Sequence, residues 1–242
     1  LVATSGVLET DGGPVGIDVL CLEEDSARKL DSELTPSGEI VTWNLDRLGI
    51  PLIEIATAPD VKTPDHAKQT SIALGRTLRD TRRVRRGLGS IRQDLNVSIM
   101  CGDRVEIKGC QDLDWIPRII RCEMARQLHF YRLANRLRDS HGLPNLPSDR
   151  RLESDSIRSD VEEILRAEFV DVSSQFTGCE ANRVKQGLSS DSVMMALALP
   201  GFEGLIGTKE FDADGAQMPR LGRELAGAAK LAGVAGVYHS DE

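Results

Sequence analysis

The feature that most constrains this 242-residue chain is the order of its strand-like and helix-like segments, which occur in separate runs. The first 30 residues alternate moderately in polarity around the turn-forming Asp11–Gly13, which predicts a hairpin. Residues 39–45 and 51–58 are the next predicted strands, separated by a Gly-Ile-Pro breaker. Strands and helices in separate runs are typical of α+β proteins. We therefore predict an α+β fold: a mainly antiparallel sheet with flanking helices, followed by a smaller α+β domain.

Two long helices and a second hairpin are predicted after the first strands. A helix runs from Pro64 to Asp80, with Thr63 as its N-cap. The segment SIRQDLNVSIMCGDRVEIKG alternates again and turns at its Cys-Gly-Asp, which predicts a second hairpin. Residues 114–142 form the most strongly helical stretch, interrupted near its start at Pro117.

The composition changes from Leu143 to Ser159, where Pro, Ser and charged residues accumulate. Such a composition favours a boundary between domains. We predict a first domain over residues 1–142 and a second over residues 143–242, with no internal repeat. In the second domain we expect a helix over 160–168, a strand over 193–201, a helix over 221–233 and a strand over 234–240.

The chain has a formal net charge of −8, so any basic surface is local. Its positive charge comes mainly from arginine, with only seven lysines. Arginine suits bidentate recognition of phosphate. A GC-rich genome or a salt-rich cytoplasm would produce the same bias, and both interpretations stay open.

The five cysteines include no C-x-x-C pair, which argues against a zinc knuckle or a disulfide framework and indicates a reducing compartment. No apolar run approaches the roughly 18 residues of a membrane helix. We therefore expect a cytoplasmic protein, with neither a membrane nor DNA among its partners. The sequence lacks an initiator Met and opens inside a predicted strand, so we expect a fragment of a longer protein.

An arginine cluster followed by two glycines lies between the first long helix and the second hairpin. Such a loop allows the backbone to approach a phosphate while guanidinium groups neutralise its charge. It is not a Walker A sequence, because no G-K-[ST] follows. Taken alone, a solvated basic loop after a helix C-terminus is the simpler interpretation. The residues concerned are Arg82, Arg83, Arg85, Arg86, Gly87 and Gly89.

Carboxylates occur in three settings that suit Mg²⁺, a cation that binds a few oxygens together with substrate phosphate. Glu23 and Glu24, followed by Asp25, end a predicted strand, and Glu54 lies among apolar neighbours in PLIEI. Asp94 follows Arg92 by two residues in SIRQDLNVSI. Taken singly, each carboxylate has a structural explanation, such as a solvent-facing strand position or the first turn of a helix. Only convergence of all three on one site would favour a metal.

Three long segments taken together resemble the catalytic cradle of the tRNA-dependent amidotransferases: LDRLGIPLIEIATAPD, VRRGLGSIRQDLNVSI and RVEIKGCQDLDWIP. The VRRGLG stretch is more similar to the archaeal E-type subunits than to the bacterial B-type, which carry an acidic run there. GFEGLIG, RLGRELA and GVYHSDE resemble the insertion domain that the E-type subunits share with bacterial-type aspartyl-tRNA synthetases. The resemblance covers nearly the whole chain and is weakest from about 142 to 192. It implies a cradle domain followed by this insertion domain.

The resemblance implies a carbon–nitrogen ligase that uses ATP and Mg²⁺. The family phosphorylates the γ-carboxylate of Glu on tRNA(Gln), and ammonia from a partner, the asparaginase-like D subunit, then displaces phosphate to give Gln-tRNA(Gln). Residue by residue, the resemblance implies three sets of site residues. These are Glu24 (or Glu23 in its place) and Glu54 as metal ligands, Arg92, Asp94 and Lys108 as catalytic residues beside the nucleotide, and Arg85, Arg86, Gly87 and Gly89 as substrate-binding residues.

Two family elements are absent from this sequence, an N-terminal G-L-E-[IV]-H element that supplies metal ligands and a helical C-terminal tail that grips tRNA. We therefore expect the fragment alone to be inactive. Two alternatives remain: a non-catalytic tRNA-binding module, and a ligase acting on a small molecule. Dependence on Mg²⁺ distinguishes the first alternative from the enzyme, and dependence on tRNA distinguishes the second.

Overall fold

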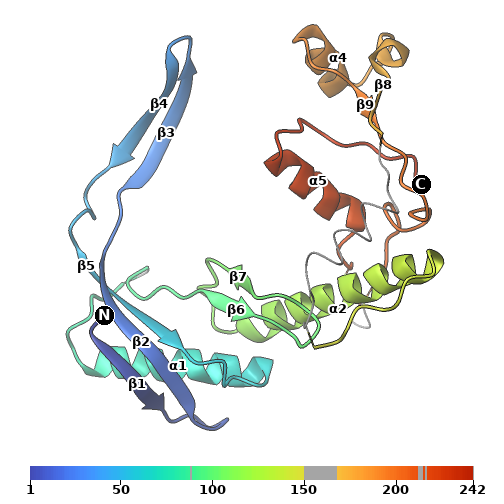
Figure 1. The fold of residues 1–242 in the computed structure, drawn as a ribbon. Coiled ribbons are helices and arrows are strands. Elements are labelled where there is room, and N and C mark those ends of the chain that lie inside the picture. The colour runs from blue at the N-terminus through green and yellow to red at the C-terminus, as the bar shows by residue number, and fades with distance from the viewer. Residues whose placement is uncertain (88, 150–167, 212–214, 216, 242) are drawn as a thin grey trace. The chain divides into compact units, whose positions relative to one another are not determined.

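The computed structural model describes residues 1–87, 89–149, 168–211, 215 and 217–241 (Figure 1). Helices combine with small sheets in which the described strand pairings are antiparallel, which confirms the α+β class. The chain divides into two compact units. The first contains Leu1–Leu95 with Ile107–Arg121, and the second contains Asn96–Glu106 with Cys122–Glu242. The boundary predicted after residue 142 stays a prediction.

The first unit is built on a three-stranded sheet of order β1-β2-β5. β1 (Ala3–Leu8) and β2 (Val15–Glu24) form the predicted hairpin, with Leu8 paired to Val15. β5 (Pro51–Thr57) pairs antiparallel with the other edge of β2. The turn between β1 and β2 needs glycine, because Gly13 has φ of +116°.

A second hairpin of the first unit joins β3 (Arg28–Thr35) to β4 (Gly38–Asn44). The predicted strand over 39–45 corresponds to β4, but β3 was not predicted. Its sequence RKLDSELT has no period-two apolar pattern, and every residue but the last is exposed. Strand pairing with β4, rather than burial, therefore defines β3.

Helix α1 (Pro64–Asp80) begins where the sequence predicts, with Pro64 in the first turn. The Thr63 side chain caps it by accepting a hydrogen bond from the His66 backbone N–H at 3.1 Å. The buried His66 ring hydrogen-bonds Thr10 Oγ1 at 2.9 Å, so the helix is tied to the β1–β2 turn.

The second predicted hairpin is present as the short strands β6 (Leu95–Val97) and β7 (Val105–Ile107). Helix α2 (Ile116–Ser140) follows. The interruption expected at Pro117 is wrong, because this proline lies in the first turn, where a backbone N–H has no intrahelical acceptor.

The remaining elements of the second unit are small. β8 (Val170–Asp171) pairs with β9 (Met195–Ala196), and a 3-10 turn (Ser173–Phe176) and α4 (Asn182–Ser189) lie between them in sequence. The strand expected over 193–201 is thus reduced to β9. Helix α5 (Leu221–Leu231) confirms the helix expected over 221–233.

Two of the elements expected in the second unit, a helix over 160–168 and a strand over 234–240, are not confirmed. The helix expected over 160–168 lies outside the described residues except for Glu168. The strand expected over 234–240 is wrong, because a strand needs a ladder partner and no described residue pairs with this segment. The carboxylate of Asp241 instead accepts hydrogen bonds from the backbone N–H groups of Gly204, Ile206 and Gly207 at 2.7, 2.8 and 3.1 Å.

Across the described ranges, no helix is both long enough and apolar enough to cross a membrane.

Candidate functional site

The register of β2 and β5 decides which of the predicted carboxylates share a face of the sheet. Glu54 lies opposite Cys21, Glu23 opposite Leu52 and Glu24 opposite Pro51. Since directly opposed residues point the same way and neighbours along a strand alternate, Glu23 and Glu54 lie on one face, as a diagonal pair. Glu24 lies on the other face. Glu23, Glu24 and Glu54 are all exposed.

Asp25, the residue after β2, is the most enclosed carboxylate in this part of the first unit, with a side chain 13% exposed. Arg92 Nη2 lies 3.2 Å from its Oδ2, and Arg47 Nε lies 3.8 Å from the same oxygen. The Ser26 backbone N–H donates to Oδ1 at 3.0 Å. The structure therefore pairs Arg92 with Asp25, a contact that the sequence analysis did not predict.

The pKa of Asp25 lies below its ordinary value. Burial favours the neutral carboxyl, but the hydrogen bond from Arg92, the charges of Arg92 and Arg47 and the hydrogen bond from Ser26 together outweigh it. Asp25 is therefore an anion at neutral pH, and it holds the end of β2 next to the segment that carries Arg92.

Asp94 and Lys108 form the second charged pair of this region. Lys108 Nζ lies 3.6 Å from Asp94 Oδ2, and the Gly109 backbone N–H donates to Oδ1 at 3.4 Å. Gln93 Nε2 also donates to the Cys110 carbonyl at 2.8 Å, so residues 93–94 are tied to residues 108–110. Both charged side chains are more than two-fifths exposed, so this pair adds little stability and both groups are open to a ligand.

The arginine loop, defined here as residues 82–87 with Gly89, follows the C-terminus of α1. Arg85 and Arg86 are exposed, and neither forms an ion pair with any residue the structure describes. Gly87 and Gly89 have φ of +115° and +76°, which side-chain-bearing residues rarely adopt. The loop has the open, cationic character that the sequence predicts.

The structure thus brings together Asp94 with Lys108 and Arg92 with Asp25, while the register separates Glu24 from Glu54. Among the described residues, no group of three or more His, Cys, Asp or Glu side chains is arranged to hold a metal ion. Sequence reasoning missed Asp25 and Arg47 as partners, although LDRLGI places an arginine shortly before the β5 strand.

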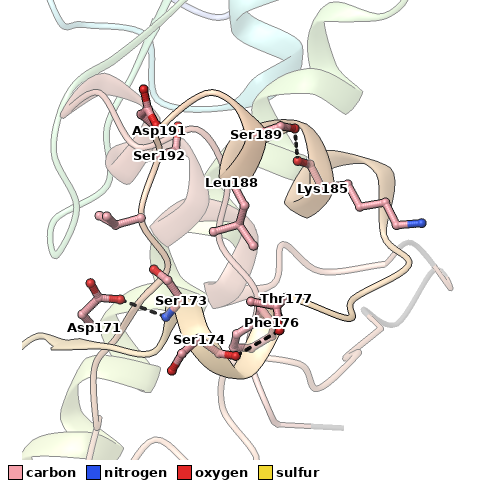
Figure 2. Close-up of a pocket in the computed structure, with 11 residues that line it drawn as sticks. Asp171, Ser173, Ser174, Phe176, Thr177, Lys185, Leu188, Ser189, Asp191 and Ser192 are labelled. Carbon is pink, nitrogen blue, oxygen red and sulfur yellow. Dashed lines mark hydrogen bonds between the residues drawn. The ribbon is translucent and has the colours of Figure 1, made fainter.

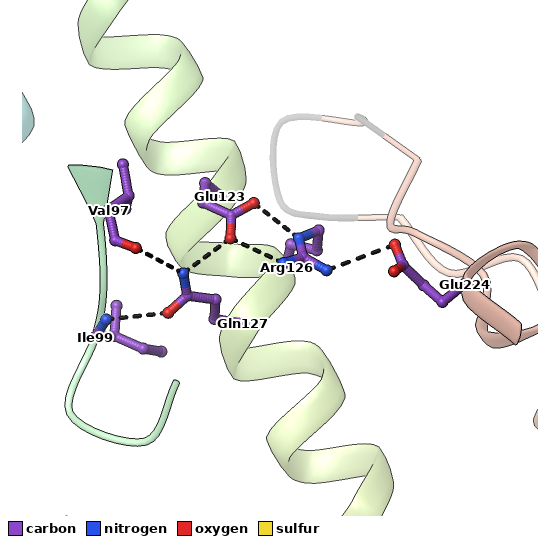
Figure 3. A network of polar contacts seen from close by, with 6 residues as sticks. All are labelled: Val97, Ile99, Glu123, Arg126, Gln127 and Glu224. Atoms are coloured by element: carbon purple, nitrogen blue, oxygen red, sulfur yellow. Dashed lines mark hydrogen bonds and ion pairs between the residues drawn. The ribbon is translucent and has the colours of Figure 1, made fainter. Parts of the chain in front are cut away.

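Sequence reasoning also missed a polar network in the second unit (Figure 3). Glu123 and Gln127, on α2, are 8% and 6% exposed, and the Glu123 carboxylate accepts hydrogen bonds from both Arg126 and Gln127. The sequence could have indicated this network, because a Glu and a Gln lie four residues apart on the buried side of an amphipathic helix. Apolar residues are expected at such positions.

A separate open pocket of about 620 Å³ lies in the second unit, between the 3-10 turn and α4 (Figure 2). Its polar groups are largely satisfied from within: the Ser173 N–H donates to Asp171 at 2.9 Å, and the Thr177 hydroxyl donates to the Ser174 carbonyl at 3.2 Å. None of the predicted site residues lines it.

Comparison with known proteins gives the class of this chain. The family model of the GatB/GatE catalytic domain matches residues 2–217, which include both charged pairs and the arginine loop. The chain therefore belongs to the GatB/GatE catalytic domain family, and the resemblance found in the sequence is confirmed.

Relatives from archaea are similar along the whole chain. The E subunit of glutamyl-tRNA(Gln) amidotransferase from Methanocaldococcus jannaschii is 41% identical over 243 residues, and that from Aeropyrum pernix is 42% identical over 245 residues. In both cases the alignment covers 100% of this chain and 34% of the relative. The chain thus spans about a third of the length of these relatives.

Proposed function

We propose that the chain is part of the catalytic subunit of a tRNA-dependent amidotransferase that converts Glu-tRNA(Gln) into Gln-tRNA(Gln) with ATP. The family match over residues 2–217 carries this proposal, and the relatives' names supply the substrate. A γ-carboxylate oxygen of the glutamyl group attacks the γ-phosphorus of ATP, and ADP leaves. Ammonia then attacks the activated carbon, and phosphate leaves with its bonding electrons. The ammonia donor is a partner protein, the asparaginase-like D subunit.

The charged pairs of the first unit suit such a reaction. Lys108, oriented by Asp94, is exposed and offers a cation to the phosphates, where negative charge develops during transfer. Arg92 holds Asp25, and its side chain is 41% exposed, so part of it remains accessible to a ligand. Arg85, Arg86, Gly87 and Gly89 are proposed to contact phosphates of the substrate.

The carboxylates of the β2–β5 sheet fit a bound Mg²⁺, which commonly takes one or two carboxylates together with phosphates and water. Glu54 and Glu23 present two such carboxylates from one face, and the register favours Glu23 over Glu24 as the second ligand. The ion would neutralise charge on the ATP phosphates. We further propose a cradle domain over residues 1–142, an insertion domain over 143–242 and a cytoplasmic location.

The test is ATP hydrolysis by the full-length parent with Mg²⁺, with and without Glu-tRNA(Gln), comparing wild type with Glu54→Gln. Loss of a metal-ligating charge costs several kcal/mol of transition-state stabilisation, so tRNA-stimulated turnover should fall by roughly 100-fold or more. Glu33→Gln, at an exposed position of β3, is the matched control and should keep wild-type turnover.

Each of the other possible results of the ATP hydrolysis experiment would contradict part of the proposal. Unchanged turnover in Glu54→Gln would make Glu54 a structural strand residue. A wild-type parent that binds tRNA without Mg²⁺ and hydrolyses no ATP would favour the non-catalytic tRNA-binding module. Turnover that does not require tRNA would favour a ligase acting on a small molecule.

A further inference from the structure

Two polar side chains of α2 are buried where the helix packs on the β6 segment (Figure 3). Gln127 Nε2 donates to the Val97 carbonyl at 3.1 Å, and Gln127 Oε1 accepts from the Ile99 N–H at 3.1 Å. The amide thus binds one acceptor and one donor on the backbone of the same segment, in the way that a neighbouring strand would. The Gln127 side chain thus takes the place that a neighbouring strand would have beside the end of β6.

Glu123 determines the orientation of this amide. Gln127 Nε2 also donates to Glu123 Oε1 at 2.8 Å, so a flipped amide would set its oxygen against a carboxylate and a carbonyl. Arg126 holds the carboxylate through two hydrogen bonds of 2.7 and 3.0 Å, and its Nη1 lies 3.5 Å from Glu224 on α5. Gln127 therefore has a single arrangement that satisfies all of its partners.

The turn after β6 packs directly on the same side chain. A Cβ added at Gly102 would clash with Gln127 Oε1 and would lie 2.8 Å from Gln127 Cβ. Even the smallest side chain at residue 102 would therefore displace the amide. The backbone from Val97 to Gly102 is held against α2 by these contacts.

The other face of the segment carries polar side chains. Asn96 and Ser98 are exposed and alternate with the buried Leu95 and Val97. Within the part of the chain that the structure describes, neither the Asn96 nor the Ser98 side chain has a hydrogen-bond partner. Both side chains are available to a ligand, at positions set by the backbone that Gln127 holds.

A buried polar network of this kind is not the most stabilising choice, because well-packed apolar residues often serve as well or better. What this network provides is a single arrangement of the backbone that it contacts, at Val97 and Ile99. We propose that Gln127 is a positioning residue that holds residues 96–99 so that Asn96 and Ser98 engage the substrate of the amidotransferase reaction. The inference rests on the proposed function.

The test uses the full-length parent with its ammonia-donating partner and compares Gln127→Leu with wild type. Three quantities are measured: kcat and KM for Gln-tRNA(Gln) formation, the melting temperature, and amide hydrogen exchange of residues 96–99. We expect a folded enzyme with faster exchange there, a kcat lowered on the order of 10-fold, as for other groups that orient a reacting residue, and little change in KM for ATP. Gly102→Ala, which displaces the amide without removing it, should give the same pattern.

Gln69→Leu is the matched control, since it removes a helix glutamine whose buried Oε1 has no partner among the described residues. It should keep wild-type kcat and wild-type exchange over residues 96–99. Wild-type kcat in Gln127→Leu, or unchanged exchange over residues 96–99, would overturn the inference. A lower melting temperature with unaltered kcat would show that the network is only structural. A wild-type enzyme that forms no Gln-tRNA(Gln) would instead overturn the proposed function, and this inference with it.

Discussion

At the scale of single residues, Asp25 shows how a carboxylate becomes a fixed anion. Its 13% exposed side chain lies near two arginines that come from segments far apart in the sequence, Arg47 and Arg92. Their charges lower its pKa despite the opposing effect of burial. Asp25 therefore stabilises the folded state only while it is ionised.

The stabilising effect of Asp25 should depend on pH. Because its pKa is lower in the folded state than in the unfolded state, its contribution is full above the unfolded value of about 3.9 and is lost as the pH falls through the folded pKa. Urea unfolding of wild type and Asp25→Asn should differ at pH 7 and converge towards pH 3. A difference in unfolding free energy that stays constant over this range would contradict the prediction.

The two glutamates at the end of β2 give a second prediction at this scale, which depends on the proposed function. Glu23 shares the face of Glu54, and Glu24 lies on the opposite face. In the full-length parent, Glu23→Gln should raise the Mg²⁺ concentration needed for half-maximal ATP hydrolysis roughly 10-fold or more, as the loss of one charged ligand would. Glu24→Gln should leave it close to wild type. The reverse result would assign the second ligand to Glu24.

At the scale of secondary-structure elements, α1 is defined by its first turn. Thr63 caps the helix, Pro64 starts it, and His66 both donates to the cap and bonds Thr10 of the first hairpin. The cap therefore supports a tertiary contact as well as the helix end.

Removing this cap should destabilise the first unit measurably. Thr63→Ala leaves the His66 N–H without its acceptor and should cost about 1 kcal/mol of unfolding free energy. Thr63→Ser keeps a hydroxyl at the same place and should retain most of it. Chemical denaturation of the three proteins measures the effect, and equal midpoints for Ala and wild type would show that the cap contributes nothing.

At the scale of the whole molecule, the charge distribution is uneven. The chain is acidic, with a formal net charge of −8, yet four arginines are gathered within residues 82–86. An acidic molecule repels RNA in general, so an RNA contact must be confined to such a local cluster.

If the arginine loop binds tRNA phosphates, its removal should change the salt dependence of binding. Arg85→Gln with Arg86→Gln in the full-length parent should reduce the slope of log K against log salt by about 1 for each arginine that contacts a phosphate. Arg28→Gln, on the exposed strand β3, serves as the control for the loss of a positive charge. An unchanged slope in the double variant would identify the arginine loop as solvated.

Elements with a strong local signal were predicted correctly from the sequence. The β1–β2 hairpin, β4, β5, α1 and α5 each combine a period of apolar residues with a turn, cap or breaker residue at the end. β3, α4 and the shortness of β9 were not predicted, since a charged strand or a short helix has no such pattern. The false strand over 234–240 has the apolar composition of a strand, but no residue in the described ranges pairs with it.

The sequence by itself determined the fold class, the family and the residue types of the candidate site, because these depend on local patterns and long motifs in order. Only the tertiary structure decided which charges meet. Arg92 pairs with Asp25 across 67 positions of sequence, and the β2–β5 register places Glu23 instead of Glu24 on the face of Glu54. The buried amide of Gln127 was likewise visible only in the structure. Contacts between distant segments are set by strand register and helix packing, and a one-residue shift of the β2–β5 register would place Glu24 instead of Glu23 on the face of Glu54.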